Sequence, residues 1–125
     1  MIIKKNLLGK ELSFEMTNRT YLNLDDKYGN AGAIVNSVCY GVKAYDDENK
    51  KPINFGKDGF VNNSLKLLAE SCLEEITIED LEENLTPGEL ITDAGNTAVE
   101  LYLDYMGVRP KKDSPEEEEE NVKKN

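Results

Sequence analysis

The two cysteines are the residues of this sequence with the most distinctive potential chemistry. Cys39 and Cys72 lie far apart in the chain, which contains no histidine. A nucleophilic thiol needs a neighbouring base, and a structural zinc ion needs four nitrogen or sulfur ligands. Residues 1–5 lack the pattern of a secretory signal, which favours a reducing compartment and free thiols. We therefore interpret both cysteines as small apolar core residues.

A short acidic cluster, residues 46–48, has the composition of a calcium-binding loop. An EF-hand loop requires oxygen ligands at positions 1, 3 and 5, glycine at 6 and glutamate at 12. Counting from Asp46, lysines occupy three of these critical positions: Lys50, Lys51 and Lys57. The pattern therefore favours a solvated loop without a metal ion. The glycines of the segment 29–32 match no complete phosphate-binding motif, and we interpret that segment as a turn.

A larger set of carboxylates follows the middle of the chain: Glu74, Glu75, Glu79, Asp80, Glu82 and Glu83. Paired carboxylates can perform acid–base catalysis on glycosides. Here they fall on the expected solvent faces of short helices, and the chain has no tryptophan to stack a sugar. We interpret them as a solvated face or as a surface for a basic partner, and we expect neither an enzyme nor a cofactor.

The charge balance excludes several classes of partner. The chain has 15 Lys and Arg against 25 Asp and Glu, a formal charge of −10. Binding to nucleic acid depends on positive charge that neutralises phosphates, so we expect no nucleic-acid partner. Hydrophobic residues make up 38% of the chain, and no apolar run approaches the ~20 residues that a membrane span needs. We therefore also expect no membrane partner.

The first sixteen residues predict a β-hairpin. Leu12, Phe14 and Met16 alternate with polar residues, as in a half-buried strand, and Gly9 can supply the turn. A two-stranded hairpin alone is marginally stable in water. It should therefore pack on the helices that follow or pair with another chain, and self-association is one expectation from this sequence.

Helical periodicity and helix-end signals dominate the rest of the chain. They predict helices over about 18–28, 31–45, 60–75, 78–84 and 87–106, and thus a mainly α bundle of about four to five helices. Thr17 or Asn18 can cap the first helix, and Gly29 can end it. The third helix should carry an apolar stripe of Val61, Leu65, Leu68, Cys72 and Ile76.

Two further start signals are clear in the second half of the sequence. Thr77 with Asp80 resembles a capping box, and Thr86 with Glu89 forms a cleaner one around Pro87. The final helix should bury Leu90, Ala94, Ala98, Leu101 and Tyr105.

Two polar segments flank or interrupt this bundle. Residues 46–59 form a long polar connection. Its apolar residues Ile53 and Phe55, with Phe60 directly after it, could create a partner-binding face or, alternatively, anchor the connection to the core. Residues 111–125 contain one apolar residue and a run of five glutamates, which predicts a disordered acidic tail. The tail would solubilise the protein or bind a basic partner. We therefore expect one domain over 1–110 and a tail over 111–125.

The order of these segments resembles a known family. Met16-Thr17 leads into residues 21–29, which end Lys27-Tyr28-Gly29. Residues 76–89 contain Leu85-Thr86-Pro87-Gly88-Glu89, and the last helix ends at residues 104–107. Over about residues 10–107 this arrangement is similar to the tail assembly chaperones of long-tailed phages and prophages.

The resemblance implies a non-enzymatic function. Such a chaperone binds the tape measure protein, a very long helical chain, and keeps it soluble until the tail tube assembles around it. The tail tube protein is a second implied partner. The expected location is the host cytoplasm, with no protein retained in the mature virion, and the family commonly has a longer frameshifted form.

Two other functions fit the residues. One is an acidic regulatory adaptor or DNA mimic that binds a basic protein. The other is a structural component of a phage tail or connector. Capture of a long coiled-coil protein, capture of a DNA-binding protein, or presence in purified virions would separate these hypotheses.

Overall fold

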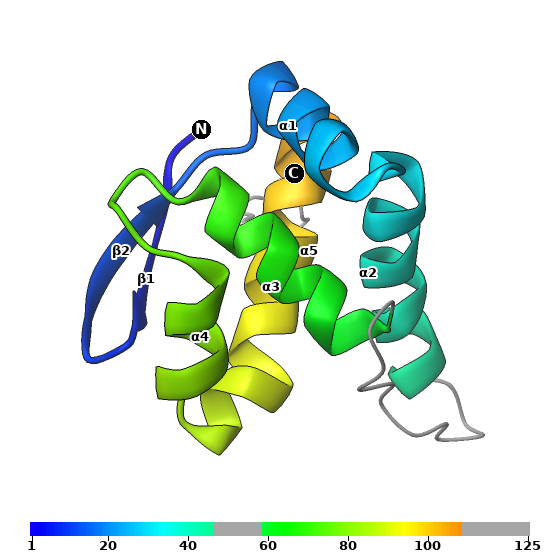
Figure 1. Ribbon diagram of the computed structural model, residues 1–125. Coiled ribbons are helices and arrows are strands. Elements are labelled where there is room, and N and C mark those ends of the chain that lie inside the picture. Colours follow the sequence, from blue (N-terminus) through cyan, green and yellow to red (C-terminus); the bar gives the residue numbers. More distant parts are fainter. Residues whose placement is uncertain (47–58, 109–125) are drawn as a thin grey trace, which may run out of the picture.

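The computed structural model describes residues 1–46 and 59–108, with side chains up to Cys39 in the first range. In these residues the chain is mainly helical and begins with a two-stranded antiparallel hairpin, which confirms the predicted fold class (Figure 1). The predicted tail and most of the connection 46–59 lie outside the described residues. The elements are β1 (Ile3–Leu7), β2 (Lys10–Phe14), α1 (Asn18–Tyr28), α2 (Ala31–Asp46), α3 (Phe60–Ser71), α4 (Ile78–Asn84), η1 (Glu89–Asp93) and α5 (Ala94–Tyr105).

The hairpin closes through a tight two-residue turn. Leu8 and Gly9 both have positive φ, at 59° and 75°, the backbone of a type I′ turn that matches the twist of the strands. The register pairs Ile3 with Phe14 and Leu7 with Lys10. Gly9 was predicted to supply the turn, and the structure confirms this.

The third helix is shorter than predicted. Its periodicity suggested that it continued to Glu75, but α3 ends at Ser71. The backbone N–H of Glu15 donates to Ser71 O at 2.9 Å, and that of Leu73 donates to Ser13 O at 2.8 Å. The residues after α3 therefore pair with the outer edge of β2. The predicted packing of the hairpin on the helical body is therefore confirmed, and its pairing with another chain stays a prediction.

Local capping explains most of the other helix boundaries. Thr17 caps α1 in a reciprocal box with Thr20, and Gly29 ends the helix at φ 89°. The Asn30 Oδ1 accepts the N–H of Ala33 at 3.0 Å at the start of α2. These contacts satisfy helix-terminal groups that have no intrahelical partner. Of the segment 29–32, which was interpreted as a turn, Gly29 and Asn30 connect the two helices, while Ala31 and Gly32 already belong to the first turn of α2.

The two predicted boxes of the second half are also present. Thr77 and Asp80 exchange hydrogen bonds of 2.9 and 3.1 Å at the start of α4. Thr86 and Glu89 do the same at 2.9 and 3.2 Å. The last helix begins as predicted, but its first turns widen into the π-helical segment η1, where Ala94 N–H donates to Glu89 O. Periodicity did not indicate this widening.

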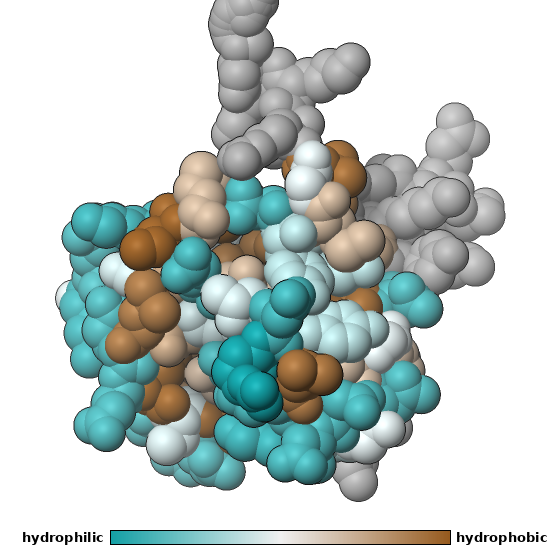
Figure 2. All heavy atoms as spheres, turned by 90° about the horizontal axis from the view of Figure 1, so that it is seen from above, coloured by the Kyte–Doolittle hydropathy of each residue, from teal (hydrophilic) through white to brown (hydrophobic). Residues whose placement is uncertain are grey.

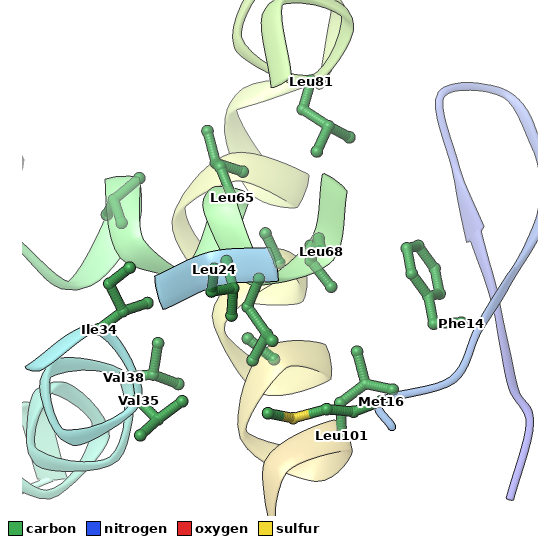
Figure 3. Close-up of a cluster of buried hydrophobic side chains, with 14 of the residues drawn as sticks. Phe14, Met16, Leu24, Ile34, Val35, Val38, Leu65, Leu68, Leu81 and Leu101 are labelled. Atoms are coloured by element: carbon green, nitrogen blue, oxygen red, sulfur yellow. The ribbon is translucent and has the colours of Figure 1, made fainter. Parts of the chain in front are cut away.

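One core joins the hairpin to every helix. Figure 3 shows side chains from β2, α1, α2, α3, α4 and α5 converging on one region. Helix α3 is central: Leu65, Leu67 and Leu68 are at most 1% exposed. The other fully enclosed large side chains are Leu7, Leu12, Phe14, Leu24, Val38, Leu81 and Leu101. Among the described residues, none of the helices is both long and apolar enough to cross a bilayer.

Candidate functional site

Of the three predicted partner-binding residues, only Phe60 is described. Phe60 is 8% exposed and belongs to the core. Its ring packs against Gly95 of α5 so closely that a Cβ on Gly95 would lie 2.3 Å from the ring Cζ. This position favours the alternative that Phe60 anchors the connection to the core. Ile53 and Phe55 lie outside the described residues, so their predicted role stays a prediction.

The two cysteines are free thiols, as predicted, but neither is fully enclosed in the core. We predicted core positions for both cysteines because each lies on an apolar stripe of an expected helix. Cys72 instead follows the end of α3, where its Sγ donates to Glu74 Oε1 at 3.4 Å. Burial raises the pKa of the Cys72 thiol to about 11 and also raises the pKa of Cys39. Both thiols therefore carry little thiolate at neutral pH.

We expect Cys72 to react slowly with alkylating reagents. Raising its pKa from 9.0 to about 11 lowers the thiolate fraction at pH 8 about 100-fold, and the thiolate is the reactive form. Iodoacetamide labelling of a Cys39→Ser variant, followed by mass spectrometry, measures this rate in the folded chain and in urea. Equal rates in the two states would contradict the assigned environment of Cys72.

The predicted carboxylate face is exposed and belongs to a larger anionic segment. Residues 67–108, here called the acidic segment, contain eleven Asp or Glu residues and no Lys, Arg or His. The carboxylates of Glu75, Glu79, Glu82 and Glu83 face solvent. Asp80 is half-buried, and its carboxylate accepts the backbone N–H of Thr77 at the start of α4.

One carboxylate of the acidic segment also tethers the hairpin. The Ser13 N–H donates to Glu74 Oε1 at 2.8 Å, and this bond lowers the pKa of the Glu74 carboxyl. In the part of the chain that the structure describes, Cys, Asp and Glu side chains form no group of three that could hold a metal ion. The arrangement therefore presents a dispersed negative surface.

Several exposed apolar side chains belong to three segments that approach one another at one end of the molecule. The start of the chain, α1 and the end of α5 meet there (Figure 1). The amino group of Met1 lies 3.3 Å from Asp104 Oδ2, and the Tyr105 hydroxyl donates to Asn18 Oδ1 at 2.7 Å. We call the five apolar side chains of these segments that are at least half exposed the apolar end: Met1 (60% exposed), Ile2 (50%), Leu22 (52%), Met106 (56%) and Val108 (53%).

The composition around the apolar end is typical of protein interfaces. The rings of Tyr21 and Tyr105 stack at a centroid distance of 6.2 Å, which joins α1 to α5. Tyrosine, methionine and arginine are enriched where proteins bind one another, and Arg19 is exposed on the same helix as Leu22. Figure 2 views the molecule from the α1 side and shows hydrophobic residues interspersed with hydrophilic ones. Such a face can hold an amphipathic partner through several separated apolar contacts.

Sequence reasoning did not find the apolar end. Leu22 lies off the stripe formed by Tyr21, Leu24 and Tyr28, and that offset was the one local signal of its exposure. The exposure of Met106 and Val108 depends on where α5 ends relative to α1, which periodicity does not encode. Comparison of the chain with protein-family models, with curated proteins and with solved structures finds no match.

Proposed function

We propose that this protein is a phage tail assembly chaperone that binds the tape measure protein and keeps it soluble until the tail tube assembles around it. The tail tube protein is the second proposed partner, and the host cytoplasm is the proposed location. The proposal starts from the resemblance of residues 10–107 to that family.

The observation that carries the proposal is the apolar end. A long helical client exposes an apolar stripe, and such a stripe is recognised through apolar anchors spaced along a helix or groove. Leu22 and Met106 are each more than half exposed. Leu22 lies on α1 and Met106 directly follows α5, and the tyrosine stack joins these two helices. Fully burying one such side chain against a client contributes about 1.5–3 kcal/mol to the free energy of binding. Two or three anchors per copy give a weak contact that gains strength when many copies bind one long client.

The acidic segment supports the same function. A net charge of −10 keeps a protein and its complexes apart from one another in solution. The exposed carboxylates of α4 lie on a different part of the chain from the anchors at the apolar end. The chaperone would therefore cover apolar client surface with one end while the rest of its surface maintains solubility.

Co-expression tests the proposal directly. The tape measure protein of the same phage genome is produced alone and together with this chain, and its soluble fraction is measured after lysis. We expect the client to be insoluble alone and soluble in a complex with the chain. A client that stays insoluble in the presence of excess folded chain would contradict the proposal.

A second candidate function is an acidic adaptor or DNA mimic that binds a basic protein. The specific observation in its favour is the complete absence of basic residues from the acidic segment, residues 67–108. A mimic should lose its partner when salt screens charge, because exposed charges interact weakly beyond ~8 Å at physiological ionic strength. A chaperone complex built on apolar anchors should persist when salt is raised.

A further inference from the structure

Helix α1 buries few of its side chains against the rest of the fold. Of its eleven residues only two are buried, Thr20 and Leu24, whereas α3 buries nine of its twelve. Thr20 serves the cap of α1 itself, where its Oγ1 accepts the Thr17 N–H at 3.0 Å. Leu24 is therefore the one large apolar side chain that this helix buries completely.

Leu24 fills a socket formed by other helices. It is 0% exposed and belongs to the same hydrophobic cluster as Val35 and Val38 of α2 and Leu65 and Leu68 of α3. Figure 3 shows it among these side chains. If α1 moved away, this socket would expose apolar surface of α2 and α3 to water.

Polar contacts near the surface attach α1 on both sides of this socket. The Glu70 carboxylate of α3 accepts Asn23 Nδ2 at 3.1 Å and Lys27 Nζ at 2.6 Å. The Lys27 side chain is 60% exposed, and an ion pair that water reaches contributes little to stability. The bond from the Tyr105 hydroxyl to Asn18 is also exposed. These contacts fix the position of α1 without holding it strongly.

Aromatic contacts complete the attachment. The Tyr21 ring stacks on Tyr105 of α5, and the Lys66 ammonium of α3 lies 5.0 Å from the centroid of the Tyr28 ring. Tyr28 is exposed, and the two stacked rings are half-buried. Because the hydrophobic contribution scales with the apolar area removed from water, partly wetted rings stabilise α1 less than enclosed ones would.

The connection between α1 and α2 is short and contains a glycine. Gly29 has φ 89°, and glycine changes its backbone angles at low cost. One hydrogen bond crosses this connection, from the Ala31 N–H to Asp25 Oδ1 at 3.0 Å. An isolated helix shorter than about 12–15 residues is marginal in water. Helix α1 would therefore lose its backbone protection once it left the other helices.

We infer that α1 is a strap that detaches from α2, α3 and α5 while the rest of the fold stays intact. Detachment breaks the contacts with Glu70, separates Tyr21 from Tyr105 and removes Leu24 from its socket. This inference does not rest on the proposed chaperone function. Leu22 of the apolar end lies on the outer face of the strap. A partner that binds Leu22 more tightly in one position of the strap shifts the strap toward that position.

Hydrogen exchange of the full chain, measured by mass spectrometry, tests the strap. A segment that opens locally exchanges faster than segments that exchange only on global unfolding. We expect the central amides of α1 to exchange at least about tenfold faster than the slowest amides of α3 and α5. The rate for α1 should rise with low concentrations of urea, because detachment exposes surface, but less steeply than the rates for α3 and α5.

Two core variants separate detachment from global unfolding. Leu7 is 1% exposed and lies beside the start of α5, whereas α1 meets the end of α5. Leu7→Ala should accelerate exchange in α3 and α5 at least about tenfold and leave α1 unchanged. Leu24→Ala should accelerate α1 at least about tenfold. Glu70→Gln should also accelerate α1, and its matched control is Glu100→Gln, which removes an ion pair with Lys5 and should leave α1 unchanged.

Three results would overturn the strap. The first is exchange of α1 in the wild type as slow as that of α3 and α5. The second is a rate for α1 that does not rise with urea, which would show fraying of the helix without detachment. The third is acceleration of α1 by Leu7→Ala as large as that of α3 and α5. Leu7→Val makes the same comparison if Leu7→Ala does not fold.

Discussion

Replacing Phe14 with alanine should lower the free energy of unfolding by about 3–5 kcal/mol, the usual cost of removing a fully buried aromatic ring. Phe14 is 0% exposed, and its backbone bridges to Cys72 just beyond α3. Its ring points from the hairpin toward the helices (Figure 3). The side chain is thus part of the core, while the backbone beside it holds the segment after α3 against β2.

Urea denaturation followed by circular dichroism measures this change. Glu11→Ala is a suitable control because Glu11 lies on the same strand and is exposed, so its loss should change stability by no more than about 0.5 kcal/mol. A loss below about 1 kcal/mol for Phe14→Ala would show that the hairpin does not share the helical core.

Gly95→Ala should destabilise the protein by about 1–3 kcal/mol, although alanine ordinarily favours a helix by about 1 kcal/mol over glycine. The sign changes because the added methyl would lie 2.3 Å from Cζ and 2.7 Å from Cε2 of Phe60. Phe60 is buried, so its ring cannot turn away without displacing other core side chains.

A second background isolates the cause of this effect. In a Phe60→Ala chain the clash is absent, so Gly95→Ala should there stabilise the protein by up to about 1 kcal/mol. Gly88→Ala is a further control, since a Cβ at Gly88 meets nothing within 4 Å. A Gly95→Ala variant as stable as the wild type in the original background would contradict the packing of Phe60 on α5.

The features that sequence predicted well are those fixed by neighbouring residues. Thr77 and Thr86 begin helices because each side chain caps a backbone N–H three residues later, and that relation is visible in the sequence. Gly29 ends α1 because glycine adopts positive φ without steric cost. Such local contacts explain why the mainly α fold with an N-terminal hairpin was predictable.

The features that sequence missed depend on residues distant in the chain. The apolar stripe of the third helix continues through Cys72, but α3 ends earlier because the chain pairs with β2, almost sixty residues away. Phe60 is buried because Gly95 leaves room for its ring. The apolar end forms where α1 meets α5, so the exposure of Leu22 is a tertiary property.

The most direct test of the account is whether the apolar end holds the tape measure client. The double variant Leu22→Glu with Met106→Glu replaces two exposed anchors, and Leu73→Glu is the matched control, since Leu73 is 55% exposed but lies beyond α3. Affinity for a purified tape measure fragment is measured by calorimetry, after thermal melting confirms that all three chains are folded. Burial of each anchor contributes about 1.5–3 kcal/mol to the free energy of binding. The double variant should therefore bind the fragment at least about 100-fold more weakly than the wild type. Leu73→Glu should bind it like the wild type. Equal affinities for the wild type and the double variant would contradict the account.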